Sequence, residues 1–319
     1  MPKAVRFDQY GGLDVLQVAE VERPTPLQGD ALVRVKAAGI NPSEAGVREG
    51  FLHRIWPTTF PSGEGTDFAG IVAELGPGVS HFAVGDEVIG YTAVFPQHLA
   101  SQADYVVVPA DHLTPRPANV PWEAAGTLYM AGATALAAIR AVGLTAGETL
   151  VVANAAGGVG SLVVQVAVAA GAKVIGLSSP AHHPWLKLRG VLPVAYGDGV
   201  AERIRAVAGG AGAGEPIDAF IDTYGADYVE LALALGVHPE RIDTIANFDA
   251  PATYGVKAEG GSAIDSDSAR VRVLADLAEA ISQGTVVVPI AHVYALEDVQ
   301  AAYRELAQGH TLGKIVLVP

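Results

Sequence analysis

The segment 149–160 constrains the fold more than any other part of the chain of 319 residues. A β-branched and apolar run at 149–152 predicts a buried strand, and a glycine turn follows it. Small residues at positions 155, 157 and 160 have the GxGxxG spacing, with alanine in the first position. They allow a tight turn, close approach of backbone N–H groups to a pyrophosphate, and close packing of a helix on the strand. The turn predicts a dinucleotide site lined by Asn154, Ala156, Gly157, Gly158, Val159 and Gly160.

The residues around this turn predict a parallel sheet. A helix over 159–170, a break at Gly171 and a strand over 173–177 complete one βαβ unit. A glycine-rich surface loop is expected at 209–214, and a six-stranded, doubly wound sheet follows if 253–258 supplies the last strand. The further elements expected are helices at 184–188, 200–208 and 226–235 and strands at 192–196, 217–222 and 241–246.

Short strands separated by Gly and Pro turns occupy the first 120 residues and predict a β-rich, barrel-like unit. They are expected at 15–21, 30–38, 68–75, 87–91 and 105–109. An alanine-rich helical pattern then runs from Pro121 to Ala141. The tail alternates between helices at 274–282 and 296–306 and strands at 285–293 and 313–318, a pattern that suits either domain.

Composition excludes several classes of protein. A net charge of −14 disfavours general binding to nucleic acid or to anionic lipid. With no cysteine, the chain has no disulfide, iron–sulfur cluster or thiolate zinc site. The start of the chain reads as a strand rather than a signal peptide, and no uninterrupted apolar span reaches about 20 residues. These features predict a soluble cytoplasmic protein with no membrane partner.

Nearly the whole chain resembles the medium-chain dehydrogenase/reductase superfamily, in particular its zinc-free quinone oxidoreductase branch, which includes zeta-crystallin-like proteins. The motifs that carry the resemblance are Ala38-Gly39-Ile40-Asn41-Pro42, Gly65-Thr66-Asp67-Phe68-Ala69-Gly70, Val84-Gly85-Asp86-Glu87-Val88, the glycine turn with Gln165, Asp218 to Asp222, and Gly313-Lys314-Ile315-Val316-Leu317.

The resemblance implies an α/β fold with a GroES-like β-rich domain at 1–121, a Rossmann doubly wound parallel sheet domain at 122–262, and a return to the first domain at 263–319. It also implies an active site in the cleft between the domains and a homodimer formed through the edge of the Rossmann sheet.

The second strand of the predicted Rossmann unit indicates the cofactor. NAD-selective sites carry an acidic residue about 20 positions beyond the turn, but no Asp or Glu lies between 173 and 197. NADP(H) is therefore expected, with its 2′-phosphate met by Ser178, Ser179 and cationic groups from His182, His183, Lys187 or Arg189. Relatives often place a lysine near 182 or 183, and histidines there would make binding depend on pH. The alternative is that both histidines are surface residues at the start of a helix.

Three more regions are expected near the cofactor because they match family positions. Tyr196 matches a position near the adenosine, although a packed strand tyrosine is the alternative. Thr134 matches a threonine beside the nicotinamide. Asn247 and Phe248 lie where the family loop meets the nicotinamide ring.

Zinc-dependent relatives hold a metal with Cys and His ligands, whereas the corresponding segment 63–67 has no His and the chain has no Cys. The sequence therefore predicts no metal site, with a site of acidic ligands as the alternative. It also predicts a hydride acceptor that is already polarised: a quinone, or the β-carbon of an enone. The resulting oxyanion needs hydrogen-bond donors and a proton.

Asn41 is the first candidate donor, and an Asx turn before Pro42 is its alternative. Many relatives carry a tyrosine at the position of Phe51. Tyr91 and Tyr129 are expected to replace that hydroxyl, with core or wall packing as the alternative. Phe51, Trp56 and Phe95 are expected to shape an apolar substrate pocket, unless they are ordinary core residues.

The sequence thus predicts an NADPH-dependent, zinc-free oxidoreductase that reduces quinones. An enone or enoyl reductase is the nearest alternative. A non-enzymatic, NADPH-binding protein similar to lens crystallins is the alternative from another class.

Overall fold

The computed structural model describes residues 1–54, 57–92, 100–209, 216–260 and 267–319. Contacts between the residues divide the chain into two compact units. Unit 1 comprises Met1–Met130, Ser266–Gln283 and Ile290–Pro319, and unit 2 comprises Ala131–Asp265 and Gly284–Pro289. The expected domain bounds at 121 and 262 stay a prediction.

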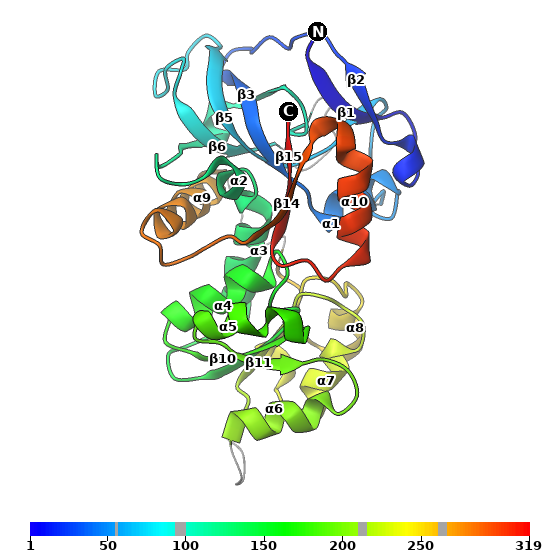
Figure 1. Cartoon of the computed structure of the whole chain (residues 1–319), viewed down its shortest axis with the longest axis vertical. Coiled ribbons are helices and arrows are strands. Elements are labelled where there is room, and N and C mark those ends of the chain that lie inside the picture. Colours follow the sequence, from blue (N-terminus) through cyan, green and yellow to red (C-terminus); the bar gives the residue numbers. More distant parts are fainter. Residues whose placement is uncertain (55–56, 93–99, 210–215, 261–266) are drawn as a thin grey trace. The chain divides into compact units, whose positions relative to one another are not determined.

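Unit 1 is built around the long strand β3 (Asp30–Gly39), which pairs antiparallel with three other strands. Most of its residues are buried, including three in succession at 31–33, and within the strand only Arg34 is exposed. The described strands of this sheet run in the order β14-β15-β3-β5-β6-β8, and β7 pairs with β3. They are β5 (Asp67–Leu75), β6 (Glu87–Tyr91), β7 (Tyr105–Pro109), β8 (Leu113–Pro115), β14 (Ile290–Ala295) and β15 (Lys314–Val318). Figure 1 labels β3, β5, β6, β14 and β15.

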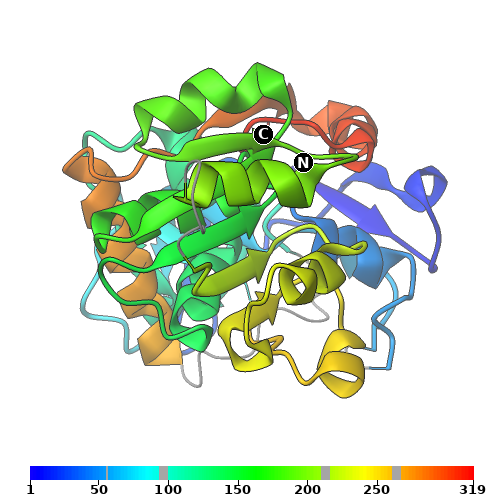
Figure 2. The same ribbon diagram turned by 90° about the horizontal axis from the view of Figure 1, so that it is seen from below.

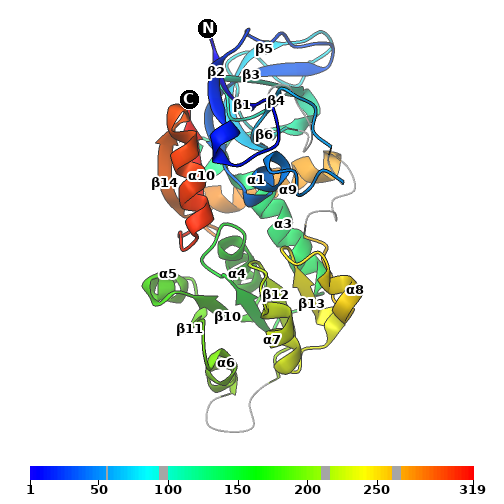
Figure 3. The same cartoon turned by 90° about the vertical axis from the view of Figure 1, so that its right-hand side faces the viewer.

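A second, smaller sheet and five helices complete unit 1. The sheet has the order β2-β1-β4, from β2 (Gln17–Glu20), β1 (Lys3–Phe7) and β4 (Ser62–Gly63). The helices are α1 (Pro42–Arg48), α2 (Trp122–Ala125), the start of α3 (Leu128–Ala141), α9 (Asp267–Ser282) and α10 (Val299–Gln308). Helix α10 packs against β14 and β15 (Figure 3), and β15 pairs with β3. The carboxy-terminal strands therefore belong to the same sheet as residues 30–39.

The strand expected at 285–293 begins later in the structure, at Ile290. The reason is a side chain in unit 2. Gln165 binds both backbone groups of Val287: its Nε2 donates to the carbonyl at 2.9 Å, and its Oε1 accepts from the amide at 2.9 Å. These bonds take the place of a sheet ladder, and Pro289 lacks an N–H to extend one.

Unit 2 contains a five-stranded parallel sheet in the order β11-β10-β9-β12-β13 within the described residues, with the strands side by side (Figure 2, green to yellow). The strands are β9 (Thr149–Ala153), β10 (Lys173–Ser178), β11 (Leu192–Ala195), β12 (Ala219–Asp222) and β13 (Ile242–Thr244). The helices are α4 (Gly160–Ala169), α5 (His183–Leu188), α6 (Val200–Gly209), α7 (Tyr228–Ala234), α8 (Ala250–Tyr254) and most of α3. Gly209 ends α6, and the rest of the predicted glycine-rich loop lies outside the described residues.

The sixth strand expected at 253–258 is wrong. Residues 253 and 254 end helix α8, which has Pro251 in its first turn and stops at Gly255 in a left-handed conformation (φ 70°). Only Lys257 makes an isolated parallel bridge, to Asp243 of β13. The predicted fold class, a GroES-like β-rich domain with a Rossmann parallel sheet, is nevertheless confirmed.

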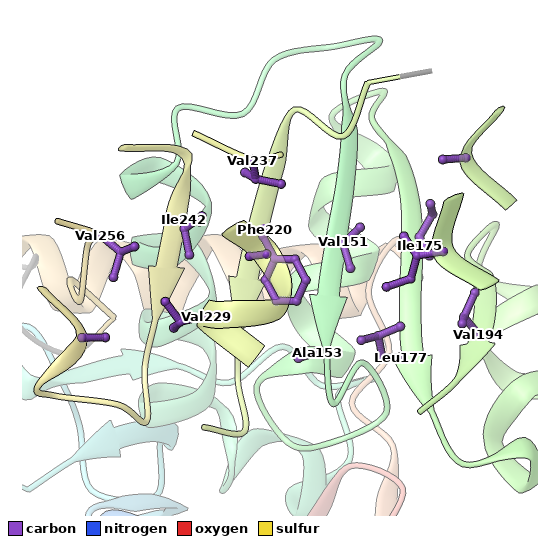
Figure 4. Packing of buried hydrophobic residues seen from close by; sticks show 14 residues of the cluster. Val151, Ala153, Ile175, Leu177, Val194, Phe220, Val229, Val237, Ile242 and Val256 are labelled. Atoms are coloured by element: carbon purple, nitrogen blue, oxygen red, sulfur yellow. The ribbon is translucent and has the colours of Figure 1, made fainter. Parts of the chain in front are cut away.

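Apolar residues from neighbouring strands fill the core of unit 2. Ile242, Phe220, Val151 and Ile175 lie next to one another across β13, β12, β9 and β10 (Figure 4). Strands covered on both faces read as continuous apolar runs, as 149–153 does. In the described part of the chain, no helix has the length and apolarity needed to cross a membrane.

Asp243 is a buried acid of which only one carboxylate oxygen has a hydrogen-bond donor among the described residues. Its Oδ1 accepts from the amide of Glu259 at 2.9 Å, whereas Oδ2 is buried with no partner among the described residues. Burial raises the pKa of Asp243 to about 6, and the nearby Glu259 carboxylate adds to the shift. Because the folded-state pKa lies above the ordinary value, folding is favoured at low pH, and this contribution is lost as the pH rises through about 6.

We predict that Asp243→Asn removes this pH dependence. The folded wild-type protein should lose on the order of 3 kcal/mol between about pH 4 and pH 7 from this group alone, and the neutral amide should not. Calorimetric melting of both proteins across this range measures the difference. The variant should gain on wild type as the pH rises, and a difference that does not change with pH would contradict the assignment.

Candidate functional site

The glycine turn after β9 is shaped by close backbone contacts. Asn154 adopts a left-handed conformation (φ 52°), which turns the chain out of the strand. A Cβ atom at Gly160 would lie 2.2 Å from the carbonyl oxygen of Asn154, and one at Gly157 would lie 2.5 Å from its Nδ2. Only glycine allows this approach of α4 to the turn, so the predicted glycine spacing has a steric cause.

The amino terminus of α4 fits an anion. Val159 stands at the cap position, no side chain caps the helix, and no acidic residue lies in its first turn. The amides of Ser161 and Leu162 donate to the carbonyls of Gly157 and Val159 at 2.9 and 3.0 Å, whereas the start of the helix carries the positive end of its dipole. A pyrophosphate placed there would meet this positive end, as the sequence predicts.

The residues predicted for the 2′-phosphate lie at the end of β10. Ser178 is 4% exposed, and its hydroxyl donates to the carbonyl of Ser179 at 3.1 Å. The Ser179 hydroxyl lies 3.4 Å from Nδ1 of His182. His183 starts α5, and its Nε2 is buried without a partner among the described residues. The structure thus brings Ser179 and His182 together, and the phosphate contacts themselves stay a prediction.

The other predicted cofactor residues lie on unit 2 at strand ends or on α3. Tyr196 directly follows β11 and is 42% exposed, which makes the alternative of a fully packed strand tyrosine wrong. Thr134 is a buried residue of α3. Asn247 follows β13 and donates its backbone amide to Thr244 Oγ1 at 3.1 Å, and Phe248 is exposed.

Tyr224 is a candidate that the sequence analysis missed. It lies two residues beyond β12, the strand next to β9, and is 61% exposed. Asp222 holds the turn here by accepting from the amides of Tyr224 and Gly225, each at 2.9 Å. Ligands of open parallel sheets bind beyond the carboxyl ends of the strands. The sequence signal that could have indicated this residue was an aromatic side chain two positions after the predicted strand 217–222.

Asn41 of unit 1 is held in a buried polar network. Its Nδ2 donates to Glu44 Oε1 at 3.0 Å and to Asp67 Oδ2 at 3.2 Å, and its Oδ1 accepts from Lys314 Nζ at 2.5 Å. Asn41 is also the N-cap residue of α1, where it forms a capping box with Glu44. A structural role at the start of this helix, as in the alternative considered above, therefore agrees with the structure, and the donor role stays a prediction. Both amide hydrogens already have acceptors, so a substrate oxygen would share or replace one of these bonds.

Glu44 is the acceptor at the centre of this network. It takes bonds from the Asn41 backbone (2.9 Å), the Thr66 backbone (2.9 Å) and the Tyr303 hydroxyl (2.7 Å), as well as from the side chains of Asn41 and Gln102. Burial and the nearby Asp67 raise the pKa of Glu44, while these donors oppose the rise. A carboxylate with this many donors satisfies its lone pairs without water.

An ion pair lies in the same interior, where Arg48 binds Glu64 with both side chains almost fully buried. Burial raises the pKa of Asp67, and the positive charge of Lys314 opposes this rise. Burial also lowers the pKa of Lys314, and it raises the pKa of Glu64 while the charge of Arg48 opposes that rise. Breaking a buried pair leaves an uncompensated charge, so these contacts order the interior.

Asp67 lies near the three residues predicted to act on the substrate. Besides Asn41, it accepts from the amide of Met130 at 2.8 Å, the residue directly after Tyr129. In the β5–β6 ladder it stands opposite Tyr91. The rings of Tyr91 and Tyr129 stack at 4.1 Å, and both are buried. Their burial agrees with packing, and a donor role stays a prediction.

A metal does not fit this region. The carboxylates of segment 63–67 belong to Glu64 and Asp67, and both are already bound to protein groups. Among the residues that the structure describes, no group of three His, Asp or Glu side chains is placed to hold an ion. Of the predicted pocket aromatics, Phe51 is 80% exposed, so ordinary core packing does not apply to it. Trp56 and Phe95 lie outside the described residues.

Comparisons with known proteins agree with this architecture. A family model for the alcohol dehydrogenase GroES-like domain matches residues 27–118, and one for zinc-binding dehydrogenases matches residues 199–317. A quinone oxidoreductase of Salmonella typhimurium is 28% identical over 338 residues, which cover 100% of both chains. A chloroplastic NADPH-dependent alkenal/one oxidoreductase of Arabidopsis thaliana is 34% identical over 170 residues, 52% of this chain and 44% of that one.

A solved structure shows the same likeness. The crystal structure of Escherichia coli quinone oxidoreductase complexed with NADPH superposes with a TM-score of 0.85 at 26% identity, over 99% of this chain and 100% of the other. The fold and the matched families define an oxidoreductase of the dehydrogenase type. The chain belongs to the medium-chain dehydrogenase/reductase superfamily, in its zeta-crystallin-like quinone oxidoreductase branch.

We predict that Gly160→Ala destabilises unit 2. The added Cβ would overlap the Asn154 carbonyl, which costs about 1–3 kcal/mol or more and exceeds the gain in helix propensity. Thermal melting measures the loss. Gly46→Ala in helix α1 is the matched control, because its Cβ would lie 3.4 Å from a flexible Leu52 atom. Equal melting temperatures for the two variants would contradict the steric account.

We predict that Tyr303→Phe destabilises unit 1. Loss of the hydroxyl removes a donor to Glu44 and an acceptor for Gln102, so the unfolding free energy should fall by about 1–3 kcal/mol. Chemical denaturation checks this value. Tyr105→Phe, on the half-buried face of β7, is the control and should be nearly neutral, and a Tyr303→Phe protein as stable as that control would contradict the assignment.

Proposed function

We propose that the protein is an NADPH-dependent reductase of quinones that works without a metal. The observation that carries the proposal is the glycine turn with helix α4, which no side chain caps. Ser178 at the end of β10 and Ser179 directly after it stand where NAD-selective sites hold an acid. The complete-length similarity to quinone oxidoreductases supports it.

The cofactor is proposed to lie along the carboxyl ends of the unit 2 strands. The turn 154–160 would hold the pyrophosphate, and Ser178, Ser179 and His183 would meet the 2′-phosphate. Tyr196 would contact the adenosine, and Thr134, Asn247 and Phe248 would approach the nicotinamide. NADPH supplies a hydride when bound.

The residues of unit 1 are proposed to act on the acceptor. Reduction of a quinone places negative charge on an oxygen, which hydrogen-bond donors stabilise. Asn41 can share with that oxygen the hydrogen that it donates to Asp67, the longer of its two bonds at 3.2 Å. The hydroxyls of Tyr91 and Tyr129 are the other candidate donors, and one of them or water would supply the proton.

The substrate class is tested by comparing acceptors. NADPH oxidation should be fast with a naphthoquinone and slower with an unsaturated ketone. Activity with the ketone alone would favour the enone reductase. The Arabidopsis relative is named for a reaction of this class. Binding of NADPH without turnover of any acceptor would favour the non-enzymatic, crystallin-like alternative. The homodimer that the resemblance implies and the cytoplasmic location that the sequence predicts remain proposals.

We predict that Ser179→Asp shifts the cofactor preference toward NADH. The added carboxylate would repel a 2′-phosphate and accept from a 2′-hydroxyl, so NADPH affinity should fall at least about tenfold while NADH affinity holds or rises. Titration of cofactor fluorescence measures both constants. Ser179→Ala is the control for loss of the hydroxyl alone. Wild-type protein that binds NADH more tightly than NADPH would overturn the cofactor assignment.

A further inference from the structure

The buried carboxylate of Asp67 binds Asn41 and the backbone beside Tyr129, and it lies opposite Tyr91 in the sheet. Its Oδ2 accepts from Asn41 and its Oδ1 from the amide of Met130, beside Tyr129. Tyr91 stands opposite it in the β5–β6 ladder. These residues come from four separate segments of unit 1, so Asp67 joins a loop, two strands and the start of α3.

The direction of the bonds gives Asp67 a defined task. An asparagine amide has an oxygen and a nitrogen of nearly the same shape, and its partners determine which way it faces. Here Lys314 donates to Oδ1, while Asp67 and Glu44 accept from Nδ2. Asp67 therefore helps to fix Asn41 with its donor nitrogen on the carboxylate side.

We infer that Asp67 is a positioning residue that holds Asn41 and the segment of Tyr129 in the arrangement needed to polarise the hydride acceptor. This inference rests on the proposed function. Asp67 does not touch the acceptor: it acts through Asn41 and through the backbone of Met130. Its replacement by a carboxamide would leave the Met130 bond intact but set a donor against the Asn41 donor.

The variant Asp67→Asn tests this role. We expect kcat with a naphthoquinone to fall at least about tenfold, while KM and the dissociation constant for NADPH change less than about twofold. Thr92→Val is the matched control, because it removes a buried bond to the Gly65 carbonyl close by without touching Asn41. If Asp67→Asn keeps the kcat of this control, the inference is overturned.

A double-mutant cycle separates positioning from a general structural loss. If Asp67 acts through Asn41, adding Asp67→Asn to Asn41→Ala should lower kcat little beyond the effect of Asn41→Ala alone. Effects that multiply in full would contradict the inference. Asp67→Glu retains the carboxylate and should recover part of the kcat that Asp67→Asn loses.

A spectroscopic measurement decides the structural claim apart from activity. The chain has only four asparagines, Asn41, Asn119, Asn154 and Asn247, so selective ¹⁵N labelling gives four side-chain amide pairs. The Asn41 pair should exchange slowly with solvent in the wild type and in Thr92→Val, and should shift and exchange faster in Asp67→Asn. An unchanged Asn41 pair would refute the inference even if the wild type reduced no acceptor, a result that by itself would refute only the proposed function.

Discussion

The contact of helix α4 with the turn below it is the constraint on which the nucleotide-binding unit depends. The helix begins where a Cβ atom at Gly160 would overlap the Asn154 carbonyl, so its first amides lie directly beyond strand β9. No side chain caps this end of the helix, and the positive end of the helix dipole lies there. The same glycine that permits the packing therefore creates the candidate anion site.

Unit 1 depends on a different kind of interaction. Its interior holds three acids, Glu44, Glu64 and Asp67. Arg48 binds Glu64, the charge of Lys314 acts on Asp67, and many neutral donors bind the carboxyl groups. Such groups are costly to bury, and they are tolerated when every lone pair has a donor. Burying these groups costs stability. Their hydrogen bonds, in return, fix the orientation of the side chains next to Asn41.

Local patterns predicted much of this fold. The sequence predicted the βαβ unit and strand β3, because residue periodicity and glycine spacing are local properties of the chain. The prediction of a strand at 253–258 was wrong because a short helix begins near Pro251 and ends at Gly255 within the apolar run. The late start of β14 could not be predicted from local sequence, because Gln165 lies more than a hundred residues away from the segment that it binds. The same holds for the bonds of Asp67, which join segments far apart in the sequence.

The most direct test of the account is an anaerobic single-turnover experiment with NADPH deuterated at the transferred position of C4 and a naphthoquinone. The account predicts that one hydroquinone forms for each NADPH oxidised, with deuterium slowing the transfer step. NADPH that binds but stays reduced in the presence of the quinone, or oxidation only with an unsaturated ketone, would contradict the central claim.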